Sequence, residues 1–284
     1  MFEMIFENKD GKQLNFGPGT PFTISNFTGL NPPKATINTN QAALIDGGTF
    51  NSSKLNMRSM NIAFAVEENA AENRLEVYKV VQSKMPLRVY YKSETLDVFI
   101  DGYVEDVDFS YWAMKNICTV SVLCPFPYFK SAQEVINDLS SIVPMFHFPF
   151  YSTVSKEITF GYIDIYTEVT VENHGSVETG LIFELYAKNT VTKPKIIEYQ
   201  TSKYFQINTT MQAGDLITVN TMQGEKTVKL LRNGIETNIF NLLDKNSTWL
   251  QLSMNDDVFV YEVETGTVAN LDVTIKHYDL YEGV

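Results

Sequence analysis

Apolar and polar residues alternate along much of this chain, with the period of two that is typical of β-strands buried on one side. The clearest case is the stretch 58–66, in which large apolar residues occupy every second position. Residues 117–124 alternate in the same way, and Pro125 and Pro127 follow directly. Because proline cannot donate to a sheet ladder, this strand is predicted to end there. The pattern predicts a mainly β chain.

Two departures from this alternation carry information. Between residues 67 and 83, apolar side chains recur at spacings of three and four, which predicts one amphipathic helix with its buried face on Ala71, Leu75, Tyr78 and Val81. Between Ile100 and Val107 the apolar positions change phase around Gly102, and this shift predicts a β-bulge.

The pattern also divides the chain. Residues 1–130 contain several strands and the single helix, and they are predicted to form a first domain, a small β-barrel or sandwich. Residues 131–150 are rich in proline and aromatic residues, and we expect them to act as a linker that packs between domains. Residues 151–284 show short strands at regular spacing with no helical pattern, which predicts an antiparallel β-sandwich.

One polar stretch interrupts the first domain. Residues 39–53 are rich in Asn, Ser and Thr and centre on Asp46-Gly47-Gly48. A loop of this length in a compact domain usually serves function or assembly. We therefore expect a long arm that a neighbouring subunit orders.

Composition narrows the function. The chain has 284 residues and a net charge of −12, which disfavours tight wrapping of nucleic acid but is compatible with a conduit through which DNA passes. Cys118 and Cys124 lie on one face of the same predicted strand, roughly 20 Å apart, whereas a disulfide needs less than about 7 Å. Free thiols suit folding in a reducing cytoplasm. Neither a signal peptide nor a membrane span is predicted.

Few residues of the sequence are candidates for metal binding or catalysis. His147, His174 and His277 are far apart and have no second ligand at metal-binding spacing, so neither a metal nor another cofactor is predicted. The stretch 222–227 contains Gly-x-Lys-Thr but lies between two strands, where a hairpin turn is favoured over a phosphate loop. No hydrolase triad with its elbow is recognisable, and we predict no enzyme.

Two aromatic residues are candidates for stacking on a sugar. They are Trp112 and Trp249, and for both a role in packing is favoured, since large aromatic side chains mostly serve cores and interfaces. Trp249 lies in the predicted sandwich. It supports the alternative function, a carbohydrate-binding module that attaches to host cell-wall glycan.

Several motifs in this order resemble a known family. They are Gly29-Leu30-x-Pro32-Pro33, the Asp46-Gly47-Gly48 turn, Arg58 at the head of an apolar strand, the helix, and the close Cys124-Pro-Phe-Pro-Tyr-Phe129. Together they are similar to phage distal tail proteins, the siphovirus-type tail components. The resemblance implies a tail-tube-like first domain, a galectin-like jelly-roll second domain, and a ring of six copies.

The function expected from this resemblance is structural. The ring would join the tail tube to the tail-tip protein at the distal end of the virion tail and leave a channel for DNA, with receptor-binding proteins as further candidate partners and no membrane contact. The chain would be made in the cytoplasm of the bacterial host. A hub of a contractile or defective particle fits the same sequence. Subunit-interface residues are predicted at Asp46, Gly47, Gly48, Phe50 and Arg58.

Overall fold

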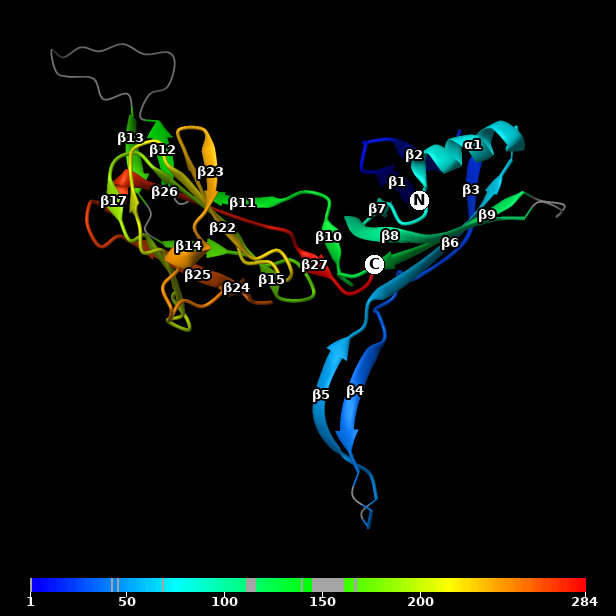
Figure 1. The fold of residues 1–284 in the computed structure, drawn as a ribbon, viewed down its shortest axis with the longest axis horizontal. Coiled ribbons are helices and arrows are strands. Elements are labelled where there is room, and N and C mark those ends of the chain that lie inside the picture. Colours follow the sequence, from blue (N-terminus) through cyan, green and yellow to red (C-terminus); the bar gives the residue numbers. More distant parts are fainter. Residues whose placement is uncertain are drawn as a thin grey trace. The chain divides into compact units, whose positions relative to one another are not determined.

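A computed structural model describes residues 2–41, 43–44, 46–67, 69–110, 116–138, 140–144, 161–165 and 168–284 (Figure 1). The chain forms two compact units. Unit 1 comprises Met1–Gln133 and Leu280–Val284, and unit 2 comprises Glu134–Asp279. The last five residues thus belong to unit 1, although the sequence placed them in the second domain.

Unit 1 is built on one nine-stranded antiparallel sheet in which the main path runs β2-β1-β7-β8-β9-β6-β3 (Figure 1). β10 pairs with β8 and with β27, so the C-terminal end of the chain closes this sheet. The strands are β1 (Glu3–Asn8), β2 (Gln13–Phe16), β3 (Phe22–Thr28), β6 (Arg58–Val66), β7 (Pro86–Lys92), β8 (Asp97–Phe109), β9 (Ile117–Cys124), β10 (Phe129–Ser131) and β27 (Leu280–Tyr281).

The predicted alternation is confirmed in the core of unit 1. Every second side chain of β6 is buried, and β9 ends at Cys124, directly before the first proline. The predicted bulge is also present, but the register shifts between Val104 and Asp106. The strand runs straight through Gly102, where a Cβ atom would lie 2.6 Å from Val122 Cγ1. Gly102 is therefore needed for close packing, not for the bulge.

The helix is shorter than predicted, and only part of its predicted face is buried: Val81, directly after the helix, is 1% exposed and Tyr78 packs against the core, as expected. α1 spans Ala70–Val80 and buries Val77 and Val80. Leu75, expected to face inward, is 56% exposed. The buried side of the helix contains Val77 and Val80 together with the predicted Tyr78, so contact with the sheet shifted the apolar face away from Leu75 rather than replacing it.

Unit 2 is a sandwich of two antiparallel sheets, of order β11-β26-β16-β21-β22-β23 and β14-β25-β18-β19. The rings of Phe183 and Phe259, one from each sheet, lie 6.0 Å apart in a single apolar core. The strands of these sheets are β11 (Val135–Asp138), β14 (Glu168–Val171), β16 (Ile182–Ala187), β18 (Lys195–Glu198), β19 (Tyr204–Gln206), β21 (Leu216–Asn220), β22 (Thr227–Arg232), β23 (Ile235–Asn238), β25 (Asp257–Glu262) and β26 (Leu271–His277).

Smaller elements complete unit 2. Two 3-10 turns, Phe240–Leu242 and Val268–Asn270, lie in its loops. Three short two-stranded pairs are β12 (Ser140–Pro144) with β13 (Gly161–Ile165), β15 (Thr179–Gly180) with β24 (Gln251–Leu252), and β17 (Val191–Thr192) with β20 (Thr210–Met211). β11 and β12 fall inside the range predicted as a linker, and residues 145–150 of that range lie outside the described residues. None of the described helices has the length and apolar character needed to cross a bilayer.

Candidate functional site

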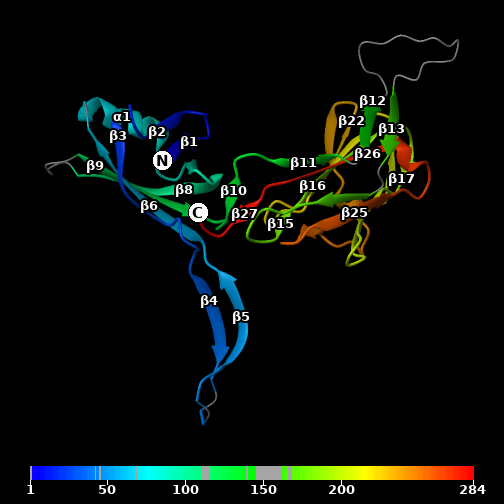
Figure 2. The ribbon, with the colours of Figure 1, turned by 180° about the vertical axis from the view of Figure 1, so that it is seen from behind.

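The polar stretch of unit 1 forms a β-hairpin rather than an irregular loop. β4 (Ala35–Asn40) pairs with β5 (Thr49–Leu55), and in the described part of the chain no third strand joins them. In both ribbon views this arm projects from the sheet of unit 1 (Figures 1 and 2). Because a two-stranded ribbon is at best marginally stable in water, the arm needs a further contact to become rigid.

The two faces of the arm differ in chemistry. The register places Ile37 opposite Ser53 and Thr39 opposite Phe50 on one face. Ile37 and Phe50 are 62% and 65% exposed. On the other face, Asn38 donates a hydrogen bond from its side chain to Ser52 at 3.0 Å. One face of the arm is thus polar and internally bonded, and the other presents unpaired apolar side chains.

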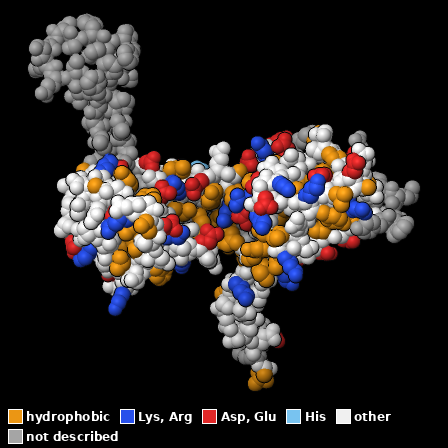
Figure 3. Space-filling model, turned by 45° about the horizontal axis from the view of Figure 1, so that its top comes forward, with side chains coloured by type: hydrophobic (Ala, Val, Ile, Leu, Met, Phe, Trp, Pro, Cys, Tyr) orange, Lys and Arg blue, Asp and Glu red, His pale blue; other side chains and the backbone are white. Residues whose placement is uncertain are grey.

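The tip of the arm contains most of the predicted interface residues. Asp46, Gly47, Gly48 and Phe50 are all exposed. Gly47 has a φ of 89°, and a Cβ atom on Gly48 would lie 2.9 Å from the Asn40 carbonyl oxygen, so both glycines are set by the turn itself. In the space-filling view, hydrophobic side chains appear at the end of this projection (Figure 3). Their role in an interface stays a prediction.

Arg58 is placed differently from its prediction. Its side chain is only 2% exposed, and its guanidinium carbon lies 4.6 Å from the centre of the Phe129 ring. A side chain in this position cannot reach a neighbouring subunit in the folded state. Arg58 therefore acts inside unit 1, and its burial does not favour the interface role predicted for it.

The Arg58 guanidinium donates to four backbone carbonyls from three distant segments. Nε donates to Pro127 at 2.8 Å, and Nη2 donates to Glu282 at 2.5 Å. Nη1 donates to Asn31 at 2.8 Å and also to Gly29. Burial lowers the pKa of Arg58 from its very high ordinary value, but the guanidinium remains a cation in proteins.

These contacts explain why the motif residues lie near one another. Gly29 has a φ of 97°, and a Cβ atom there would lie 2.6 Å from the Ser59 carbonyl oxygen. The C-terminal Val284 donates its N–H to the Leu30 carbonyl at 3.2 Å. The loop before β4, the turn after β9 and the C-terminal tail thus meet around one side chain, at the base of the arm. We call this group of contacts the Arg58 knot.

The sequence contained a signal for the knot that our interpretation missed. Arg58 has the same parity as the buried apolar residues of β6, so the alternation itself places it on the core face. A charged residue in such a position needs buried partners. The partners are backbone carbonyls, which no side-chain motif reveals.

Trp249 in unit 2 has the environment of a packing residue. Its ring lies 5.6 Å from those of Phe205 and Phe240, and Lys226 Nζ lies 5.3 Å from its centre. Trp249 is half-buried and packs against the core of unit 2, and this arrangement favours packing over the sugar-stacking alternative. Trp112 lies outside the described residues.

The metal-ligating and thiol side chains of the described residues were candidates for chemistry. No group of three or more His, Cys, Asp or Glu side chains in the described part of the chain has an arrangement that would hold a metal ion. Cys118 and Cys124 are buried free thiols, and burial raises the pKa of each to about 12. The Gly-x-Lys-Thr stretch forms the turn between β21 and β22. His147 lies outside the described residues.

Each unit of the chain matches a model of a known protein family. Residues 9–124 match the model of the phage tail protein RIFT-related domain, and residues 174–280 match the model of the siphovirus-type tail component, C-terminal domain. No curated protein matches the chain.

Two solved structures illustrate the similarity of fold. The Dit protein of phage SPP1, described as a paradigm of the hub adsorption apparatus in phages that infect Gram-positive bacteria, aligns over 99% of both chains with a TM-score of 0.68 and 16% identity. A chain of the phage P2 baseplate in its activated conformation aligns over 100% of both chains with a TM-score of 0.58 and 14% identity.

Proposed function

Because the chain belongs to the siphovirus-type tail component family, we propose that it forms the distal hub ring of a phage tail. The ring connects the tail tube to the tail-tip protein, and receptor-binding proteins attach to it. The observation that carries the proposal is the order of the two family domains along one chain, together with an arm whose apolar face has no partner within its own unit.

The arm is the element through which we propose that copies associate. In a closed ring each subunit presents one surface to the next and receives a different one, so a projecting element and a separate acceptor surface are what such a ring requires. Burying Ile37 and Phe50 against the next copy would remove two large apolar side chains from water. It would also protect the open edges of the ribbon from uncontrolled pairing.

The arm makes a sharp test possible. The full-length chain is expected to form a six-copy ring, visible by light scattering and electron microscopy. The double variant Ile37→Ser/Phe50→Ser is expected to remain folded but to lose the ring. A matched control is Ile235→Ser/Met254→Ser in unit 2, because these side chains are 66% and 64% exposed, nearly the same as the arm pair. Rings that survive the arm variant would refute the proposed contact.

Location in the particle is tested separately. Antibody labelling of purified tails is expected to mark the distal end, between the tube and the tip. Label along the tube or at the head would contradict the hub assignment, whatever the arm variants show.

The channel for DNA is proposed to lie along unit 1. On β8, Glu105, Asp106 and Asp108 are exposed on the sheet surface. Carboxylates facing a channel repel phosphates and avoid the counterion exchange that holds DNA on basic surfaces. Lys substitutions at these positions are expected to slow DNA ejection without preventing tail assembly. Unchanged ejection would argue that another surface lines the channel.

A further inference from the structure

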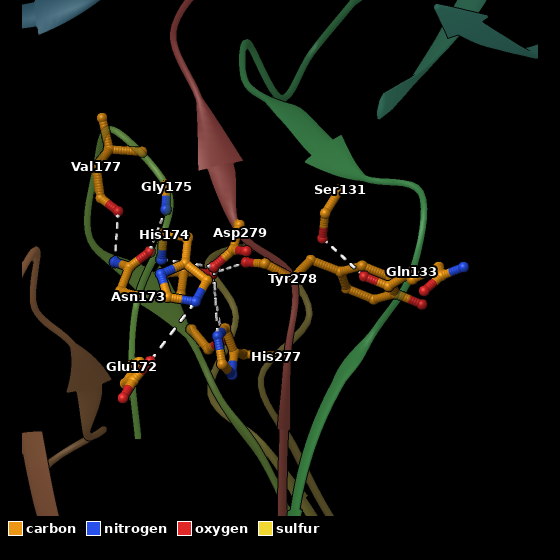
Figure 4. Close-up of polar contacts among 12 residues, drawn as sticks. Ser131, Gln133, Glu172, Asn173, His174, Gly175, Val177, His277, Tyr278 and Asp279 are labelled. Carbon is orange, nitrogen blue, oxygen red and sulfur yellow. Dashed lines mark hydrogen bonds and ion pairs between the residues drawn. The ribbon is translucent and has the colours of Figure 1, made fainter. Parts of the chain in front are cut away.

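A buried histidine lies where the chain is about to leave unit 2. His277 ends β26, is 0% exposed, and precedes by two residues the point where the chain passes to unit 1. Its Nε2 lies 3.4 Å from Oδ1 of Asp279, which is 5% exposed (Figure 4). Within the described residues, neither ring nitrogen of His277 has a hydrogen bond of good geometry.

Asp279 also stabilises a turn through a hydrogen bond. Its Oδ1 accepts the backbone N–H of His174 at 3.1 Å, directly after β14 and the adjoining residue Glu172. Within the turn, Asn173 Oδ1 accepts the Gly175 N–H at 2.8 Å, and the Asn173 amide donates to Ser253 O at 2.8 Å. One carboxylate therefore bonds the turn 173–175 and lies beside the imidazole, as Figure 4 shows.

Two hydrogen-bond acceptors lie near the ring of His277. They are the Asp279 carboxylate and the Glu172 backbone carbonyl, and both favour its charged form. A neutral imidazole has only one N–H to offer. Full burial acts in the opposite direction, because it penalises the charged form. Burial is the largest effect, so the pKa of His277 is lowered from its ordinary value.

Other charged groups around the ring do not compensate for burial. His174 Nε2 lies 3.6 Å from Glu172 Oε2, and both side chains are more than 60% exposed. His174 also opposes a positive charge on His277. On the neighbouring position of β26, Lys276 is bonded to Glu184 at 2.7 Å. Asp279 is thus the only buried carboxylate facing the imidazole among the described residues.

We propose that His277 and Asp279 form an acid-operated latch, in which protonation of His277 releases the turn 173–175 from the end of β26 while the core of unit 2 stays folded. Opening the turn hydrates the imidazolium, which the closed site cannot do. Release of a surface turn costs far less than unfolding the sheets, so the response is local. The latch would make the end of unit 2, from which the chain continues into unit 1, sensitive to mild acid.

The size of the response follows from proton linkage. In the opened turn His277 has an ordinary pKa of about 6.5, whereas the closed site disfavours the proton. At pH 5.5 the opened form is then stabilised over the closed form by up to about tenfold relative to neutral pH. The response saturates at the lower pKa of the closed site.

Hydrogen exchange of the full chain tests the latch. Between pH 7.5 and 5.5, protection factors of residues 172–175 and 277–279 are expected to fall by up to about tenfold, while those of β16 stay constant. His277→Gln is expected to abolish this loss. His174→Gln, at an exposed neighbouring histidine, is the matched control and should keep it. Acid loss that persists in His277→Gln, or equal loss in β16, would overturn the proposal.

A titration of the wild-type histidines gives an independent answer if the His277 variant fails to fold. The chain contains three histidines, so their ring signals are resolvable by NMR. His277 is expected to titrate below the ordinary histidine pKa of about 6.5, with its transition coinciding with the loss of protection in the turn. Titration of His277 at or above that ordinary pKa would refute the latch. Asp279→Asn should enlarge the acid response, since it removes the charge that offsets burial.

Discussion

The two units bury charge in opposite ways. Among the described residues, the buried polar or charged side chains include one in unit 1, Arg58, and eight in unit 2. Unit 1 buries a cation that gathers backbone carbonyls from three segments. In unit 2, carboxylates such as Asp215 and Asp257 accept backbone N–H groups at turns. The Arg58 guanidinium does not titrate, whereas Asp215 and His277 do, and the folded state lowers the pKa of both, so these buried groups of unit 2 should be more sensitive to acid than Arg58 is.

The two units also differ in their balance of acidic and basic residues. Unit 1 has 15 Asp and Glu against 12 Lys and Arg, whereas unit 2 has 19 against 10. The net charge of −12 therefore says little about unit 1, where the channel is proposed. The acidic strip on β8 supports that proposal better than the total charge does. Whole-chain charge is a poor guide to any one surface of a two-unit protein.

The strongest test of this difference in buried charge between the units is Arg58→Met. The variant keeps a long apolar stem and removes the guanidinium. Four buried carbonyls lose their donor, and we expect a loss of about 3–5 kcal/mol, confined to unit 1. Calorimetry or denaturant unfolding that resolves the two transitions measures it. A loss below about 1 kcal/mol would mean that the three segments of the Arg58 knot pack together without the guanidinium.

A smaller effect is expected in unit 2 from Asp215→Asn. Asp215 Oδ2 accepts the Gln212 N–H at 2.7 Å and lies 2.5 Å from Arg232 Nη2, an interaction that lowers the pKa of Asp215. We expect a loss of about 1–3 kcal/mol at neutral pH. A lowered folded pKa stabilises the fold above about pH 4, and this stabilisation disappears as pH falls through the folded pKa. The variant and wild type should therefore converge in strong acid; a constant difference would contradict this origin.

Arg88→Met is the matched control for Arg58→Met. Arg88 also lies over a phenylalanine ring, 4.2 Å from the centre of Phe99, and it bonds Asp101 at 2.7 Å. Both members of that pair are at least 40% exposed, so we expect a loss of no more than about 1 kcal/mol, reduced further by salt. If Arg88→Met lost as much unfolding free energy as Arg58→Met, burial would not explain the importance of Arg58.

The smallest effect on folding is expected from the arm. Ile37 and Phe50 have few contacts in the single chain, so Ile37→Ser/Phe50→Ser should change the unfolding free energy of unit 1 by no more than about 0.5 kcal/mol. The same variant should abolish the ring. Denaturant unfolding at concentrations too low for assembly isolates the first quantity. A large loss there would show that the arm packs within its own subunit.

Local sequence patterns determined much of this fold. The alternation in 58–66 and 117–124 identified two central strands, and Pro125 fixed where the second one ends. These features follow from neighbouring residues alone, because side-chain direction in a strand repeats every two residues and proline acts on its own backbone. The order of short motifs was likewise sufficient to indicate the family.

Only the tertiary structure decided the features that depend on distant contacts. Arg58 meets Glu282, 224 residues away, and backbone carbonyls give no sign of this in a sequence. Contact with the sheet decided which side chains α1 buries, and only the pairing of β4 with β5 showed that the polar stretch is a hairpin. Period and propensity act over a few residues, whereas burial depends on which segments the whole chain brings together.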